Sequence, residues 1–335
     1  MYLGKMTCSI KLADKYILPG ANSIEIKKSV HQIVQTAKVL IPLSMVMQNN
    51  QVVERIKITD KIKEGDKITI SFGYNGFNKV EFIGYIKRIN QKQPLELECE
   101  DEMYLLRRVK MKKSFKKNDI REVLQYVMDE THKQFGIGFK LYDNIPKITV
   151  TNLLINGGNG IEVLQELFDK YLTTTYLTTY KGDKILYAGL TYGLKKARVK
   201  HVLTRNTINI DSLKYQQAAD MAYKCEVTNF RDDGTVRKVT FGDKNGQELK
   251  VYAMHTKTDK ELEHVAMAEI AKFQNTSYKG SFTTFPFPYC EPGDISDMTD
   301  PQFADRKGSY YIGTVTTTFN GSGGRLKPEI DIRVA

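Results

Sequence analysis

The sequence of 335 residues has no tryptophan and only four cysteines. Carbohydrate-binding surfaces usually use large aromatic rings, so the absence of tryptophan weakens the case for a sugar-active protein, although 19 tyrosines keep that case open. The cysteines lie far apart and form no Cys-x-x-Cys pair, which argues against a zinc site or a redox motif. We predict that all four are small buried hydrophobic residues: Cys8, Cys99, Cys225 and Cys290.

Long apolar runs are missing as well. No stretch approaches the ~18 residues that a membrane-spanning helix needs. The longest candidate, residues 40–47, is interrupted by Pro42 and Ser44. Residues 1–15 contain polar side chains where a signal peptide would require an apolar segment. We therefore expect synthesis and folding in a cytoplasm, with no membrane span.

Catalytic and ligand-binding motifs are also lacking. The glycine cluster at residues 157–160 has neither the spacing of a dinucleotide fingerprint nor the Lys-Ser/Thr of a P-loop, which favours a tight turn into a helix. Glu261 and His264 form one i,i+3 pair, whereas a di-iron bundle needs two. The acidic stretch 294–305 lacks the alternation of a calcium-binding loop. No Gly-x-Ser-x-Gly elbow occurs. We therefore predict a protein that is not an enzyme and has no cofactor or metal.

What the sequence does have is an excess of positive charge, with a formal net charge of +11. Three interpretations of its densest part remain open. The cations could contact nucleic-acid phosphates while Phe115 stacks on a base. They could form an edge strand and linker whose lysines prevent aggregation, or a docking strip for an acidic ring of partner subunits. This basic strip consists of Arg107, Arg108, Lys110, Lys112, Lys113, Lys116 and Lys117.

The N-terminal part of the chain has the patterns of β structure. Alternating apolar residues at 68, 70 and 72 predict a half-buried strand, and residues 74–77 predict a hairpin turn. We expect a long strand over residues 30–42. In residues 95–100 apolar and acidic side chains alternate, so we expect Glu96, Glu98 and Glu100 to face solvent. Gly84 within a strand predicts a bulge or a sharp bend.

The middle of the chain combines helices and strands. Asp119 and Glu122 form a capping pair before a helix that should end near Gly136. Beyond residue 205 the pattern returns to β, with an amphipathic helix over residues 261–274. The sequence leaves open whether residues 243–277 pack with the middle region.

One pattern occurs near both ends of the chain. It begins with a Gly-Asp turn, passes through a strand marked by glycine and ends in a strand of alternating apolar and charged residues. Two similar β units suit an assembly protein that must offer equivalent surfaces more than once. The residues that mark the turns, strands and bulges are Gly65, Asp66, Gly84, Gly293, Asp294, Gly308 and Gly313.

Near the C-terminus a Pro-Gly-Asp turn, residues 292–294, precedes a Lys-Gly-x-Tyr strand, residues 307–310, and a final hairpin follows. In these features the sequence resembles the closing strands of phage baseplate hub proteins. The family is the late control D group, which includes the Mu-type tail hub and the hub half of the type VI secretion spike protein. The segments similar to its N-terminal barrel are residues 24–43, 64–68 and 82–86.

The resemblance implies an α+β, mostly β fold. Two similar tail-tube-type β-barrels, residues 1–106 and 206–335, would flank a small α+β domain of residues 107–205, to which residues 243–277 could also belong. The family implies a homotrimer in which two barrels per subunit form a ring of six, so that a threefold hub matches a sixfold tube. We then expect the basic strip to stay clear of the narrowest part of the central channel.

The implied function is a structural baseplate hub of a contractile phage tail or related injection machine, located in the virion and assembled in the host bacterial cytoplasm. The implied partners are the tail tube protein, other baseplate proteins and a spike, which we expect to be a separate polypeptide because no spike domain follows the second β unit. The family adds no catalytic residues. The alternatives are a nucleic-acid-binding protein that uses the basic strip, although we expect no specific nucleic-acid binding, and a polysaccharide-active tail enzyme.

Overall fold

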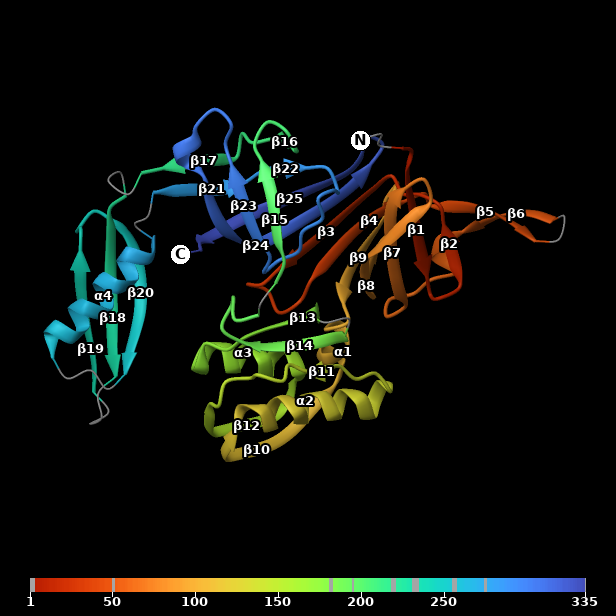
Figure 1. The fold of residues 1–335 in the computed structure, drawn as a ribbon. Helices are drawn as coiled ribbons and strands as arrows, with labels where there is room; N and C mark the ends of the chain where they lie inside the picture. The colour runs from red at the N-terminus through yellow and green to blue at the C-terminus, as the bar shows by residue number, and fades with distance from the viewer. Residues whose placement is uncertain are drawn as a thin grey trace. The chain divides into compact units, whose positions relative to one another are not determined.

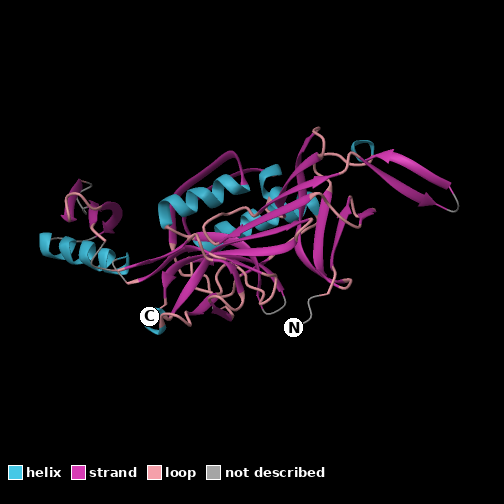
Figure 2. Ribbon diagram, turned by 90° about the horizontal axis from the view of Figure 1, so that it is seen from above, coloured by secondary structure: helices cyan, strands magenta, loops and turns pink. Residues whose placement is uncertain are grey.

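A computed structural model describes residues 4–49, 52–180, 183–194, 196–217, 221–230, 235–254, 258–273 and 276–334. These residues are mostly strands, accompanied by four α-helices (Figure 2). The mostly β, α+β class predicted from the sequence is therefore confirmed. All four cysteines are free and buried, as predicted. The chain divides into two compact units, of which the first comprises Met1–Ala197, Thr284–Asp294 and Gly313–Pro328, and the second comprises Arg198–Thr283, Ile295–Ile312 and Glu329–Ala335.

The first unit contains a large, mainly antiparallel sheet. Its strands are β1 (Met6–Leu12), β2 (Tyr16–Leu18), β3 (Ser23–Ser29), β4 (Thr36–Ile41), β7 (Lys67–Tyr74), β8 (Phe77–Asn90), β9 (Leu95–Asp101), and parts of β22 (Thr283–Thr284), β24 (Gly308–Asn320) and β25 (Gly323–Arg333). They are hydrogen-bonded in the order β22-β25-β24-β3-β4-β9-β8-β7-β1-β2. Fully buried aliphatic side chains such as Ile10, Ile26, Val39 and Leu97 form its core, because alternate residues of each strand face the same side.

A separate hairpin belongs to the same unit. It consists of β5 (Ser44–Asn49) and β6 (Val52–Lys57), which pair with each other and are followed by the 3-10 helix η1 (Ile58–Asp60) (Figure 1). The hairpin turn predicted at residues 74–77 is confirmed between β7 and β8. Asn75 and Gly76 have φ angles of +54° and +84°, the left-handed conformations that a tight two-residue hairpin turn requires.

The predicted long strand over residues 30–42 is wrong in its first half. β3 ends at Ser29 and β4 begins only at Thr36. Gln35 closes the turn between them: its Oε1 accepts the Ser29 N–H at 2.6 Å and its Nε2 donates to the Ser29 carbonyl at 3.1 Å. A buried side-chain amide thus takes the place of the ladder hydrogen bonds that a continuous strand would make.

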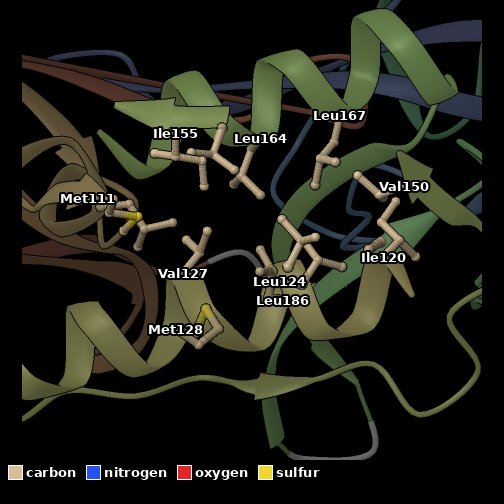
Figure 3. Packing of buried hydrophobic residues seen from close by; sticks show 14 of the residues in the cluster. Met111, Ile120, Leu124, Val127, Met128, Val150, Ile155, Leu164, Leu167 and Leu186 are labelled. Carbon is tan, nitrogen blue, oxygen red and sulfur yellow. The ribbon is translucent and has the colours of Figure 1, made fainter. Parts of the chain in front are cut away.

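Helices and short sheets follow β9 in the first unit. They are α1 (Tyr104–Arg108), β10 (Lys110–Asp119), α2 (Ile120–Phe135), β11 (Lys140–Leu141), β12 (Thr149–Asn159), α3 (Gly160–Tyr171), β13 (Thr174–Tyr180) and β14 (Asp183–Gly189). β10 pairs with β12, and β11, β14 and β13 form a three-stranded sheet. Figure 3 shows Leu124 and Val127 of α2 pointing toward Leu164 and Leu167 of α3, all fully buried in one core.

The boundaries predicted for α2 are confirmed, but Asp119 and Glu122 do not form the predicted capping pair, because the Glu122 carboxylate accepts a hydrogen bond from the Asn118 amide at 2.7 Å. Asp119 caps α2 by accepting the Arg121 N–H at 2.8 Å, and Gly136 ends the helix with a φ of +66°. At residues 157–160 the glycine cluster leads directly into α3. There Asn159 and Glu162 form a reciprocal capping box, which accounts for this segment as a helix start.

The second unit consists of short strands and one helix. Its elements are β15 (Arg198–Val202), β16 (Thr207–Asn209), β17 (Leu213–Gln216), β18 (Tyr223–Phe230), β19 (Val236–Gly242), β20 (Gln247–Met254), α4 (Asp259–Phe273), β21 (Ser277–Ser281), β23 (Ile295–Thr299), η3 (Ala304–Arg306) and parts of β24 and β25. The predicted helix over 261–274 corresponds to α4, with Gln274 outside the described residues. Its residues Leu262, Ala266 and Ile270 are buried against the β19-β18-β20 sheet (Figure 1).

Candidate functional site

The first copy of the repeated motif is a tight turn before β7. Gly65 has a φ of +91°, which a side chain would strain, and the Asp66 N–H donates to the Lys63 carbonyl at 3.1 Å. The Asp66 carboxylate accepts the Lys63 N–H at 2.9 Å and so closes the turn from the other side. The Gly65 N–H and the Ile86 carbonyl, 2.7 Å apart, join this turn to β8.

The second copy before β23 has the same hydrogen-bond pattern. Gly293 has a φ of +89°, the Asp294 N–H donates to the Glu291 carbonyl at 3.1 Å, and the Asp294 carboxylate accepts the Glu291 N–H at 2.8 Å. Pro292 occupies the position that favours proline in such turns. This carboxylate also accepts the Ala197 N–H at 3.1 Å and is buried, and burial raises the pKa of Asp294.

Consecutive strands follow each turn. β7, β8 and β9 are successive neighbours in their sheet, and β23, β24 and β25 are likewise paired in succession. Gly308 begins β24 and pairs with Met298 of β23. Further along β24, the Gly313 carbonyl accepts the Val30 N–H at 3.0 Å and the Ser29 hydroxyl at 3.3 Å. The two copies therefore share a turn and a strand succession.

Gly84 has a different role from the predicted bulge. It pairs with Asp101 in β9, and a Cβ at this position would lie 2.1 Å from the carbonyl oxygen of Glu100. Glycine is needed because two backbones approach closely. The register of β8 shifts instead at Glu81 and at Lys87. Bulges re-aim side chains, and Glu81 is directed into a cavity while Lys87 reaches Glu100.

The prediction that the glutamates of β9 face solvent is wrong for Glu96 and Glu100, which are only 7% and 3% exposed. Lys38 contacts Glu96 at 2.9 Å. Lys87 and Arg107 contact Glu100 at 2.6 and 3.2 Å. The long cationic side chains cover the face of the sheet that was expected to be open, and their charges compensate the buried carboxylates.

The structure divides the basic strip between two elements. Arg107 and Arg108 end α1, where Arg107 pairs with Glu100 and the Arg108 guanidinium lies 5.6 Å from the ring centre of Tyr104. These two arginines are therefore engaged within the first unit. The five lysines all belong to β10, and each is exposed: Lys110, Lys112, Lys113, Lys116 and Lys117.

Two of the exposed lysines flank an exposed apolar residue. Side chains alternate along a strand, so Lys112 and Lys116 lie on the face of β10 opposite the buried Phe115. Ser114, between them, pairs with Leu154 of β12, which is 67% exposed. A single solvent-exposed leucine is common on protein surfaces and does not by itself mark an interface.

A cavity of about 270 Å³ in the first unit brings together charged residues that no sequence motif connects. Its walls come from β3, β8, β9, β13, β14 and the turn at Glu291. The charged residues that line it are Lys28, Glu81, Asp101, Lys184, Lys196 and Glu291.

The lysines of the cavity are paired. Glu291 lies 3.9 Å from Lys28 and 3.8 Å from Lys196. Lys184 contacts Glu102, which lies next to the cavity wall. Burial lowers the pKa of Lys184 to about 8 and also lowers the pKa of Lys196. These pairs fix the three ammonium groups against carboxylates.

Two carboxylates of the cavity are not fully paired. Glu81 Oε2 and Asp101 Oδ2 have no hydrogen-bond partner among the described residues, and both residues are only 6% exposed. The other oxygen of Asp101 accepts the Met103 N–H at 3.2 Å. Burial raises the pKa of Glu81 and raises that of Asp101 to about 7. Sequence reasoning missed this site, and its one local signal is Glu81 between Val80 and Phe82 in a strand.

Two kinds of feature are absent from the part of the chain that the structure describes. The described residues contain no group of three or more histidine, cysteine or acidic residues placed to hold a metal ion. Nor do they include a helix whose length and apolar character would allow it to cross a membrane.

Comparisons with known proteins give strong structural and no sequence matches. No protein-family model and no curated protein matches the chain. A tail protein of prophage MuSo2 from Shewanella oneidensis aligns with a TM-score of 0.63 at 14% identity, over 98% of both chains. A tail protein from Neisseria meningitidis aligns with a TM-score of 0.61 at 10% identity, over 98% of this chain and 96% of that one.

A third similar structure is a component of the type VI secretion system of E. coli, with a TM-score of 0.56 at 10% identity over 97% of this chain and 77% of that one. All three alignments cover almost all of this chain, so the similarity concerns the order of its elements from end to end. The chain has the fold of these phage tail and type VI secretion proteins, which is the resemblance predicted from its sequence.

Proposed function

We propose that this protein is a structural baseplate hub of a contractile phage tail or related injection machine. The observation that carries the proposal is the almost complete structural alignment with a prophage tail protein, over 98% of both chains. In this role the protein joins a trimeric spike to a hexameric tail tube within the virion baseplate. Its work is binding and positioning, without a catalytic step.

The proposed architecture explains how one chain can serve two symmetries. Residues 1–106 and 206–335 would each supply a tail-tube-type barrel, with residues 107–205 as a domain inserted between them. Three subunits then present six equivalent units to the tube. The matching turns at Gly65-Asp66 and Gly293-Asp294, each followed by three strands paired in succession, support this equivalence.

The exposed lysines of β10 supply a docking strip in this proposal. Two of them, Lys112 and Lys116, flank Leu154, and an apolar centre with a charged rim suits a protein partner better than a phosphate backbone. An acidic surface of the tube or of another baseplate protein would complement them. The same proposal keeps the strip away from the narrowest part of the channel, where cations would hold passing DNA.

The purified protein is expected to form a trimer. Sedimentation equilibrium should give a mass three times the 38.3 kDa of one chain. Obligate subunit interfaces are large and apolar, so the mass should be insensitive to salt. A mass of one chain over the whole concentration range up to about 100 μM would contradict the hub proposal, since oligomers held by standard interfaces assemble well below that concentration.

A nucleic-acid-binding measurement distinguishes the proposed docking strip from the alternative, a nucleic-acid-binding protein. We expect the isolated protein to bind duplex DNA no more tightly than about 1 μM at about 0.15 M salt, with equal affinity for unrelated sequences. Fluorescence anisotropy over a range of salt concentrations measures this. Tight binding that falls steeply with salt, and that Lys112→Glu/Lys116→Glu abolishes while Lys133→Glu on α2 does not, would favour a nucleic-acid-binding protein instead.

A further inference from the structure

The cavity of the first unit contains buried carboxylate oxygens that lack hydrogen-bond partners among the described residues. Glu81 and Asp101 line it, both are more than nine-tenths buried, and one carboxylate oxygen of each has no hydrogen-bond partner there. Buried polar atoms are almost always paired in folded proteins. Two such oxygens in one cavity therefore point to a bound group that donates hydrogen bonds.

Three lysines and three carboxylates line the cavity, but the lysines are engaged by groups other than the free oxygens of Glu81 and Asp101. Lys184 is engaged by Glu102, and Lys28 and Lys196 share Glu291. The Lys196 ammonium also donates to the Thr178 hydroxyl at 2.8 Å. The atoms left without a hydrogen-bond partner thus belong to two carboxylates. Hydrogen bonds between charged groups are the stronger ones, so the donor that satisfies Glu81 and Asp101 should be a cation.

The size and lining of the cavity favour an organic cation over a metal ion. Its 270 Å³ is about nine times the ~30 Å³ that a water occupies in the liquid, far more than one ion needs. The ring of Tyr176 and the side chain of Phe82 also line it, and aromatic rings attract cations. A guanidinium presents N–H donors in a planar fork that fits carboxylates.

We propose that this cavity binds a small organic cation with several N–H donors, an alkylguanidinium or alkylammonium, whose donors occupy the free oxygens of Glu81 and Asp101. This site is independent of the proposed hub function. The cation could come from a free amine or from an arginine or lysine side chain of a second copy of the chain.

Isothermal titration calorimetry with agmatine tests the proposal on the whole chain. We expect saturable binding at one site per chain, at least tenfold weaker in Glu81→Gln and in Asp101→Asn. Asp129→Asn removes an exposed carboxylate of α2 and should bind as the wild type does. N-butylurea, neutral and similar in shape, should not bind. If a side chain of a second copy normally fills the cavity, agmatine should also lower the mass measured by sedimentation.

Several outcomes would overturn the proposal. They are the lack of saturable agmatine binding, equal affinity in the wild type and both cavity variants, and saturation by calcium chloride in place of agmatine. Circular dichroism establishes whether the variants fold. Should either fail to fold, a wild-type crystal soaked in agmatine decides: density for the guanidinium at Glu81 and Asp101 supports the site, and an agmatine-free cavity refutes it.

Discussion

Gly84→Val is expected to lower the free energy of unfolding by about 3 kcal/mol or more. The reason is steric: the new Cβ would lie 2.1 Å from the Glu100 carbonyl oxygen and 2.9 Å from the Cα of Asp101, both backbone atoms of β9. A flexible side chain could move aside, but here the β8–β9 ladder itself must separate. Urea unfolding followed by circular dichroism and by tyrosine fluorescence measures the loss.

Matched variants distinguish this clash from a general effect of removing glycine. Gly20 belongs to the same unit, and a Cβ added there would meet no other atom within 4 Å, so Gly20→Ala should change stability by less than about 0.5 kcal/mol. Gly84→Ala adds the same Cβ atom as valine does, so this variant should already be clearly less stable than the wild type. Wild-type stability of Gly84→Val would show that the backbones of β8 and β9 do not approach closely at this position.

Features fixed by neighbouring residues were predictable from the sequence. The hairpin at Asn75 and Gly76 follows from residues that tolerate positive φ, and the start and end of α2 follow from Asp119 and Gly136. Such signals depend on backbone chemistry within a few residues. The repeated Gly-Asp turn belongs to the same class, which explains why it was recognisable at both ends of the chain.

Features that depend on distant partners were not predictable. The strand over residues 30–42 looked continuous because nothing in its pattern reveals that the Gln35 amide folds back onto Ser29. Alternation placed Glu100 toward water, yet Lys87 and Arg107 cover it. Each error concerns a polar side chain whose surroundings are assembled from several elements, and periodicity describes only its own strand.

The cavity is the clearest case of this limit. Glu81 comes from a bulge in β8 and Asp101 from the end of β9, so their approach depends on strand register rather than on spacing. The burial of these carboxylates also lowers the stability of the folded protein, because burial disfavours the charged form of a carboxylate that lacks a partner. Binding sites are often retained at such a cost to stability. Removing the Asp101 charge should therefore stabilise the free protein while it weakens cation binding at least tenfold.

Asp101→Asn is accordingly expected to raise the free energy of unfolding at pH 8 by about 2 kcal/mol. Burial raises the pKa of Asp101 from 3.8 to about 7, so the folded state binds this proton more tightly than the unfolded state does. The contribution of Asp101 to wild-type stability is therefore present in full below pH 4 and is lost as the pH rises to about 7. At 1.36 kcal/mol per pKa unit, the loss amounts to roughly 4 kcal/mol. The buried amide of asparagine lacks a hydrogen-bond partner, which costs about 1–3 kcal/mol and offsets part of the stability gained by removing the charge.

The pH dependence of the gain is what identifies its cause. Urea unfolding at pH 8 should show Asp101→Asn above the wild type. At pH 4 the order should reverse, because the wild-type carboxyl is then protonated and neutral while the unpaired amide still costs about 1–3 kcal/mol. Asp129→Asn, on the exposed face of α2, should match the wild type at both values. A variant that is less stable than the wild type at pH 8 would mean that Asp101 already has a charged partner in the folded protein.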